Sequence, residues 1–169
     1  MARRHPLPRL WLMTDERQGA GLWDALERLP RGAGIVFRHY SLPGGERRRL
    51  FRRIRSVARQ RGLILVAAGP PPGAADGTHG RRGRGIMTRS VHNLRELRAA
   101  ERDGADLLFL SPVFATRSHP GGRPLGASRF ASLARRTRLP VIALGGMDAD
   151  KAAGLAGAYG WAGIDAWSR

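Results

Sequence analysis

The stretch that decides the fold runs from Arg84 to Asp148 and contains two turn segments, Ser111-Pro-Val-Phe-Ala-Thr-Arg-Ser-His119 and Leu144-Gly-Gly-Met-Asp148. Each turn segment follows a short apolar run and precedes a segment with the pattern of a helix. A barrel of alternating strands and helices carries its chemistry on strand-to-helix turns of this kind. The rest of the chain is interpreted as the scaffold for that end of a barrel.

Outward from this stretch, apolar runs alternate with helical patterns along the chain. Eight runs are expected to be strands: 10–14, 34–38, 63–68, 75–79, 86–88, 106–110, 140–144 and 161–167. Helices are expected at 22–29, 46–60, 94–103, 128–136 and 148–158. Continuous apolar strands alternating with helices indicate a covered parallel sheet. The pattern therefore predicts a (β/α)8 TIM barrel. A flavodoxin-like open sheet is the alternative, although it leaves about three runs unexplained.

The expected barrel must be trimmed. We expect one domain over residues 1–169, whereas an eight-unit barrel usually has about 250 residues. The third apolar run is followed by Gly69-Pro-Pro-Pro-Gly73, which cannot form a helix because proline lacks the amide donor. At least one helix is therefore predicted to be missing.

The composition restricts the setting and the partners. The chain has no cysteine, so a disulfide framework is excluded and a cytoplasmic location is expected. Its apolar runs are too short to cross a membrane. The formal charge is +17, from 30 basic and 13 acidic residues, but the arginines are scattered and do not favour nucleic acid as the partner. A positive field would instead attract a small phosphorylated substrate.

Two loops carry candidate phosphate ligands. Gly145 and Gly146 follow the seventh expected strand and precede an Asp-capped helix, where backbone amides can approach an anion. Thr116 and Ser118 lie with Arg117 on a glycine-rich loop, and hydroxyl and guanidinium groups suit a phosphate or diphosphate. A structural turn and a solvated loop remain the alternatives.

Other polar residues end or follow strands. Arg38 ends the second expected strand beside apolar residues and therefore needs a partner. Ser90 follows the fifth expected strand and is expected to face the barrel mouth. The carboxylates available to a mouth site are few, namely Asp15, Asp76, Asp148 and Asp165. Mg²⁺ requires carboxylates, and no convincing pair emerges, although Asp76 is a candidate metal ligand.

Four segments together resemble the thiamine phosphate synthase and TenI superfamily. They are 90–96 (SVHNLRE), 104–106 (GAD), 111–118 (SPVFATRS) and 140–147 (PVIALGGM). Members of this superfamily are phosphate-binding (β/α)8 barrels. The synthase joins hydroxymethylpyrimidine diphosphate to a thiazole phosphate and expels diphosphate with Mg²⁺, and the TenI branch includes a thiazole tautomerase. The resemblance implies a transferase of thiamine biosynthesis, with Mg²⁺ as a cofactor.

The resemblance also implies roles for individual residues. By position, the pyrimidine diphosphate would be held by Arg38, Ser90, Thr116 and Ser118, and the thiazole phosphate by Gly145, Gly146 and Ser168. His119 stands where the synthase has a lysine, and it joins Arg38 and Ser90 as a candidate catalytic residue.

Several positions depart from the synthase pattern. Val36 and Tyr40 replace a glutamine and a lysine around the second-strand arginine, and Ala67-Ala68 replaces a metal-binding Asn-Asp. The tautomerase histidine aligns with Pro112. Loss of a metal carboxylate removes transition-state stabilisation. We therefore expect a protein that binds a thiazole phosphate, with synthase activity weak or lost.

The sequence is also compatible with other functions. They are an intact synthase that uses His119, His39 and Asp76 in place of the lost groups, a tautomerase-like enzyme, and a non-catalytic barrel that binds phosphate or RNA. A trimmed barrel with exposed edges is also expected to pair with a second copy as a homodimer.

Overall fold

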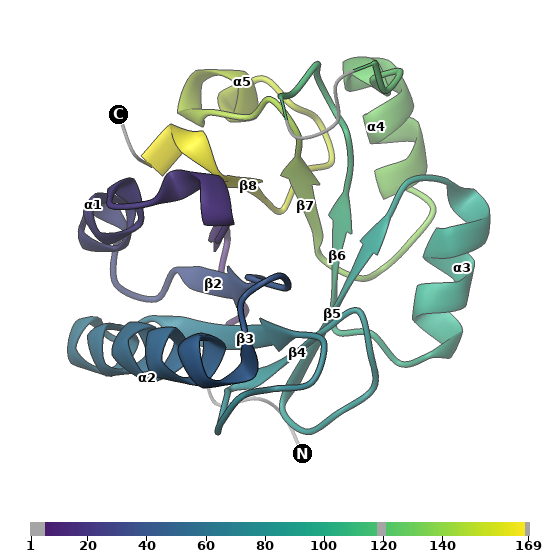
Figure 1. Ribbon diagram of the computed structural model, residues 1–169. Coiled ribbons are helices and arrows are strands. Elements are labelled where there is room, and N and C mark those ends of the chain that lie inside the picture. The colour runs from purple at the N-terminus through teal and green to yellow at the C-terminus, as the bar shows by residue number, and fades with distance from the viewer. Residues whose placement is uncertain (1–5, 118–120, 168–169) are drawn as a thin grey trace.

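In a computed structural model, described for residues 6–117 and 121–167, eight parallel strands close into a ring in chain order (Figure 1). The strands are β1 (Leu10–Met13), β2 (Gly34–Phe37), β3 (Ile64–Ala68), β4 (Gly77–His79), β5 (Ile86–Val91), β6 (Leu107–Leu110), β7 (Val141–Leu144) and β8 (Gly160–Gly163). Pairing of Leu10 with Trp161 joins β1 to β8. The predicted trimmed barrel is confirmed, and the open sheet is wrong.

Within the described residues, five α-helices and two short 3₁₀ segments lie outside the ring. They are η1 (Glu16–Gln18), α1 (Gly21–Arg28), α2 (Gly44–Arg61), α3 (Leu94–Arg102), α4 (Gly126–Ala134), α5 (Ala149–Ala153) and η2 (Asp165–Trp167). Three expected boundaries are wrong. The fifth strand continues past Thr88 to Val91, and α5 ends at Ala153, because Gly154 follows, rather than near Ala158. The eighth strand ends at Gly163 rather than Trp167, since residues 165–167 form η2.

The interior of the ring is filled by large side chains set against small ones. Trp11 is fully buried there and meets the Phe109 ring edge-on at a centroid distance of 5.3 Å. Gly34 makes room for the indole, because a Cβ at this position would lie 2.2 Å from Trp11 Cε3. Filling of this kind makes the ring a packed core, not a pore.

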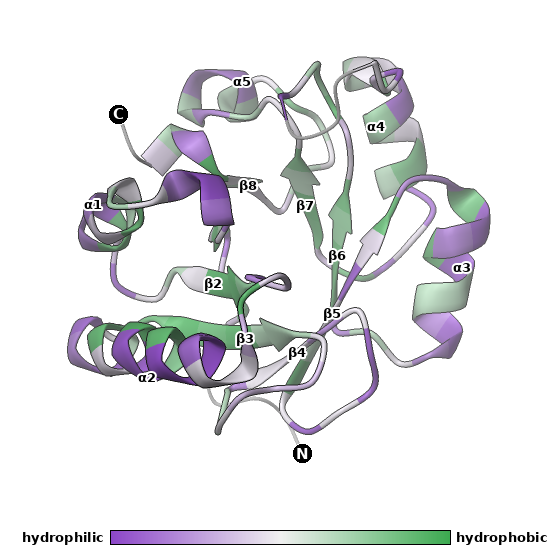
Figure 2. Cartoon of the chain, in the orientation of Figure 1, coloured by the Kyte–Doolittle hydropathy of each residue, from purple (hydrophilic) through white to green (hydrophobic). Residues whose placement is uncertain are grey.

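Two further apolar clusters lie between the ring and its helices. One joins β1 to β3 with α1 and α2, and the other joins β5 to β8 with α3 and α4. On α2, Phe51, Ile54 and Ala58 are buried on one side, while arginines cover the other side (Figure 2). The predicted start of α3 is confirmed, since the Asn93 side chain accepts a hydrogen bond from the Glu96 amide.

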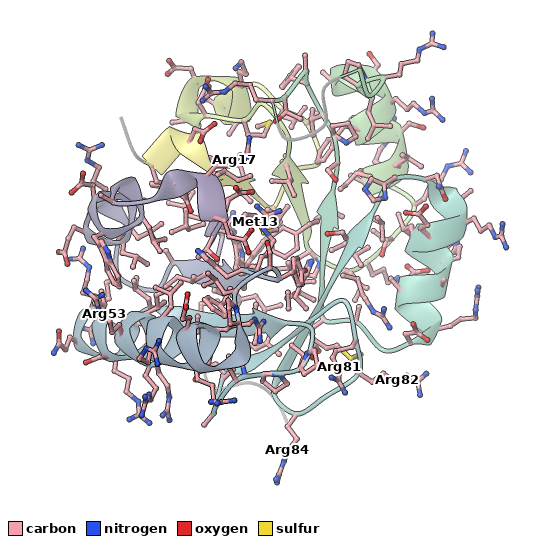
Figure 3. The ribbon with its side chains drawn as sticks, viewed as in Figure 1. Met13, Arg17, Arg53, Arg81, Arg82 and Arg84 are labelled. Carbon is pink, nitrogen blue, oxygen red and sulfur yellow. The ribbon has the colours of Figure 1, made fainter. Side chains whose placement is uncertain are left out.

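Loops replace helices on one side of the ring. In the described chain β3, β4 and β5 follow one another with no helix between them. The β4–β5 return packs closely, because a Cβ on Gly83 would lie 2.4 Å from Thr78 Cγ2, and Arg89 donates to the Gly80 carbonyl at 2.7 Å. Arg81, Arg82 and Arg84 of this return are drawn on the outside of the molecule (Figure 3). Among the described residues, no helix is long and apolar enough to cross a membrane.

Candidate functional site at the carboxyl ends of β6 to β8

A cavity of about 370 Å³ lies at the carboxyl ends of the last three strands. Its wall is formed by the loop after β6, the turn after β7 and the segment after β8, and Arg38 reaches it from the end of β2. Six of the residues that line it carry its charged, hydroxyl and glycine-turn features, namely Arg38, Thr116, Gly145, Gly146, Lys151 and Asp165. Five of these six were candidates for the mouth from sequence, and Lys151 was not.

The Gly145-Gly146 turn is fixed against the loop after β6. Both residues have positive φ, 99° and 61°. A Cβ on Gly146 would lie 2.5 Å from the Ala115 carbonyl oxygen, and one on Gly145 would lie 2.9 Å from Pro112 Cα. Two hydrogen bonds tie the segments together, from the Val113 amide to the Leu144 carbonyl and from the Phe114 amide to the Gly145 carbonyl. Only glycine fits this turn without displacing the neighbouring backbone.

The helix after this turn contributes less than the sequence suggested. It has only five residues, and Asp148 and Asp150 place two carboxylates at its start. The positive charge beside the turn comes instead from Lys151, whose Nζ donates to the Gly146 carbonyl at 2.8 Å and to Asp148 at 3.0 Å. Sequence reasoning missed the role of Lys151, although it is the only lysine in the chain and follows the turn closely.

Arg38 has the partner that its position demanded. Its Nη2 lies 3.0 Å from Asp15 Oδ2, and its Nε donates to the Thr14 carbonyl at 2.8 Å. Burial raises the pKa of Asp15, but hydrogen bonds from Arg17 and the charge of Arg38 outweigh burial and hold that pKa below its ordinary value. The pair therefore stays ionised and holds Arg38 at the mouth.

The loop after β6 is joined to the end of the chain across the mouth. Arg117 Nη2 lies 2.7 Å from Asp165 Oδ2, so a guanidinium from this loop meets a carboxylate from η2. Thr116, the neighbouring residue, lines the cavity as well. The loop thus brings both a hydroxyl and a cation to the cavity that contains the glycine turn.

Ser90 lies in a second polar group, inside the ring on β4 and β5. Its hydroxyl is 3.2 Å from His79 Nε2, and His79 Nδ1 is 2.9 Å from Thr88 Oγ1. Burial, together with the charges of Arg38 and Arg89, lowers the pKa of His79 to about 4, so the imidazole is neutral. Ser90 is exposed but does not line the cavity. The structure therefore brings Arg38 and Thr116 to the cavity and leaves Ser90 outside it.

Some expected site residues lie elsewhere. Asp76 precedes β4 at the amino end of the ring, where its carboxylate accepts a hydrogen bond from the Leu65 amide at 2.8 Å. The prediction of Asp76 as a metal ligand at the mouth is wrong, because the mouth lies at the carboxyl ends of the strands and Asp76 lies at their amino ends. His39 is buried, with Nδ1 2.9 Å from the Thr14 hydroxyl. Ser118, His119 and Ser168 lie outside the described residues.

The mouth does not fit a carboxylate-held Mg²⁺. Over residues 6–117 and 121–167, no group of three histidine, aspartate or glutamate side chains is placed to hold a metal. The third strand ends in two fully buried alanines, Ala67 and Ala68. A guanidinium lies over this end, because Arg47 donates to the carbonyls of Ala68 and Pro70, each at 2.9 Å.

A closed ring of eight parallel strands, with a cavity at the carboxyl ends of its last three, defines a small (β/α)8 barrel protein with a cation-rich mouth. Over residues 74–167 the chain matches the family model described as thiamine monophosphate synthase. It is 31% identical to "Putative thiamine-phosphate synthase 2" of Aquifex aeolicus, over 94% of this chain and 96% of that protein. The chain belongs to the thiamine monophosphate synthase family, as the resemblance predicted, and is a synthase/TenI-like protein of thiamine biosynthesis.

Other similarities differ in extent. Thiamine-phosphate synthase of Bacillus velezensis is 29% identical over 94% of this chain and 82% of its own length. The match to the synthase of Chloroflexus aurantiacus, at 37% identity, covers 50% of this chain and 40% of that protein. The solved thiamine phosphate pyrophosphorylase from Pyrococcus furiosus superposes with a TM-score of 0.80 at 24% identity, covering 96% of this chain and 88% of that one. That likeness bears on the fold.

Proposed function

We propose that the chain binds a thiazole phosphate in the mouth cavity, with the phosphate beside Gly145 and Gly146. The observation that carries this proposal is the glycine turn, which shares one cavity with the Thr116 hydroxyl and with the cations of Arg38 and Lys151. Family membership supplies the class of ligand. A cavity of about 370 Å³ lies within the size range of small-ligand sites.

The groups around the cavity suit a phosphate dianion. Backbone amides in a turn with positive φ can converge on an anion. A hydroxyl and two charged donors add charge-assisted hydrogen bonds, which are stronger than neutral ones. We propose that these groups bind the ligand within a single barrel domain over residues 1–169, in the cytoplasm. Pairing with a second copy stays a prediction.

We propose further that joining of the pyrimidine diphosphate is weak or lost. A synthase must stabilise a departing diphosphate, and positioned cations or metal ions usually do this. Here Ala67 and Ala68 offer no oxygen side chain at the end of β3, and Tyr40, which stands in a lysine position, is 64% exposed. Arg38 remains as a cation for the departing group. The expected result with both substrates is little or no diphosphate release.

Calorimetry tests the binding proposal. Thiazole phosphate titrated into the native chain should bind, and Thr116→Ala should weaken the affinity by about tenfold, the effect of one lost hydrogen bond to a charged group. Ser56→Ala, which removes an exposed hydroxyl from α2, is the matched control and should bind as the native chain does. An absence of binding heat with the native chain would reject the proposal.

A further inference from the structure

Three carboxylates at the mouth, Asp15, Asp148 and Asp165, are each paired with a cation of the chain itself. The pairs are Asp15 with Arg17 and Arg38, Asp148 with Lys151, and Asp165 with Arg117, at nitrogen–oxygen distances of 2.8, 3.0, 3.0 and 2.7 Å in that order. Four cations thus surround three carboxylates. A divalent metal site has the opposite balance, with oxygen anions in excess of the protein's own cations.

Arg47 adds a further cation at the ring. Its guanidinium lies against the carbonyls at the ends of β2 and β3, including His39 at 3.0 Å and Ala68 at 2.9 Å. It is held in place by four such bonds and by packing over the Phe37 ring. A divalent cation near the end of β3 would therefore meet a fixed like charge and a carbonyl that already has a donor.

We propose that the mouth binds its phosphate without a divalent metal, and that Asp165 and Asp148 hold Arg117 and Lys151 until the anion replaces these carboxylates. The inference rests on the proposed function for the identity of the ligand, but it concerns how the anion is held. Exchange of partners is feasible because the pairs are exposed. The side chains of Arg117 and Asp165 are 75% and 45% accessible, and such surface pairs contribute little to stability. A phosphate dianion offers each cation a stronger acceptor.

The two ways of holding a phosphate predict opposite effects of removing a mouth carboxylate. In a metal-held site the carboxylate is a ligand, so its loss weakens binding. In a site built from cations, Asp165→Asn releases Arg117 and tightens binding, by about two- to fivefold for an exposed pair. Asp103→Asn is the matched control, because Asp103 is 38% accessible, pairs with Arg82 and Arg89, and lies outside the cavity.

Lys151→Gln gives the complementary test. It removes the ammonium beside the glycine turn and should weaken phosphate binding by about tenfold, with or without metal. Arg98→Gln is its matched control. Arg98 is 51% accessible and pairs with Glu101 three residues away, just as Lys151 is 47% accessible and pairs with Asp148 three residues away.

The experiment is a set of calorimetric titrations of the full chain and its variants, with thiazole phosphate and separately with inorganic pyrophosphate, each in EDTA and in MgCl₂. Equal affinity in both buffers, tighter binding by Asp165→Asn and weaker binding by Lys151→Gln are expected. Binding that appears only with MgCl₂, or that Asp165→Asn abolishes, overturns the inference and leaves the proposed function standing. Metal-independent binding of pyrophosphate alone, with the same response to the variants, supports the inference and rejects the proposed function. No binding of either probe rejects both.

Discussion

Replacing Gly146 by alanine tests the geometry of the turn on which the site depends. The residue has a φ of 61°, which an alanine adopts at a cost. The added Cβ would also lie 2.5 Å from the Ala115 carbonyl oxygen and 3.0 Å from Phe114 Cβ. One substitution therefore strains the backbone and drives the loop after β6 away from the turn after β7.

The two effects have separate magnitudes. A non-glycine residue in the left-handed region costs roughly 1–2 kcal/mol. A contact of 2.5 Å with backbone has no flexible side chain to give way, and overpacking of this kind costs about 1–3 kcal/mol. Gly146→Ala should therefore lower the free energy of unfolding by about 3 kcal/mol. For a chain of this length, that corresponds to a melting temperature lower by roughly 10 °C.

Two other glycines separate the effects. Gly32 has a φ of 82° with open space around its Cβ position, so Gly32→Ala should show the backbone cost alone. Gly154 has a φ of −96° and also has open space, so Gly154→Ala should be neutral or slightly stabilising. Urea unfolding followed by far-UV circular dichroism measures all three variants. The order of destabilisation should be Gly146, then Gly32, then Gly154.

The result that would refute this reasoning is a Gly146→Ala variant as stable as Gly32→Ala. The loop after β6 would then not lie against the turn, and the cavity wall described above would be absent. Binding of thiazole phosphate by Gly146→Ala at native affinity would also refute the reasoning, because a displaced loop after β6 would move Thr116 away from the ligand.

Three further predictions concern the barrel as a whole. Trp11→Ala should lower the free energy of unfolding by about 3–5 kcal/mol in urea titrations, because it empties the centre of the ring. Burial lowers the pKa of His79 from 6.5 to about 4, so between these pH values the unfolded chain binds a proton that the folded chain does not. The free energy of unfolding should therefore fall by up to about 3 kcal/mol as the pH drops from 6.5 to 4, and by less in His79→Gln. Asn93→Ala should cost about 1 kcal/mol in thermal unfolding, by removing the cap of α3.

Much of the ring could be predicted from sequence because its strands are continuously apolar. Runs such as Leu107–Leu110 and Val141–Ala143 are buried throughout, which is typical of the strands of a covered parallel sheet. The order of the runs then placed Gly145 and Gly146 at the mouth beside the loop that carries Thr116. This placement needed only the direction of the chain, not the contacts of any side chain.

Features that depend on long-range partners were missed. The fifth strand was expected to end at Thr88, because Arg89 and Ser90 are polar, yet Arg89 reaches Asp103 outside the ring and Ser90 reaches His79 inside it. Asp76 was misplaced because β4 has only three residues, so a shift of one or two positions moves a side chain to the other end. The pairing of Asp15, Asp148 and Asp165 with cations is likewise invisible in a linear sequence.

The return between β4 and β5 has a practical consequence. It crosses the ring's height in six residues, from Gly80 to Gly85, and it lies on the side of the ring away from β8. New sequence grafted there would lengthen a surface connection and shift no strand register. A reporter domain inserted after Arg82 should thus leave thiazole phosphate binding intact, so this loop is a suitable insertion site for building ligand sensors.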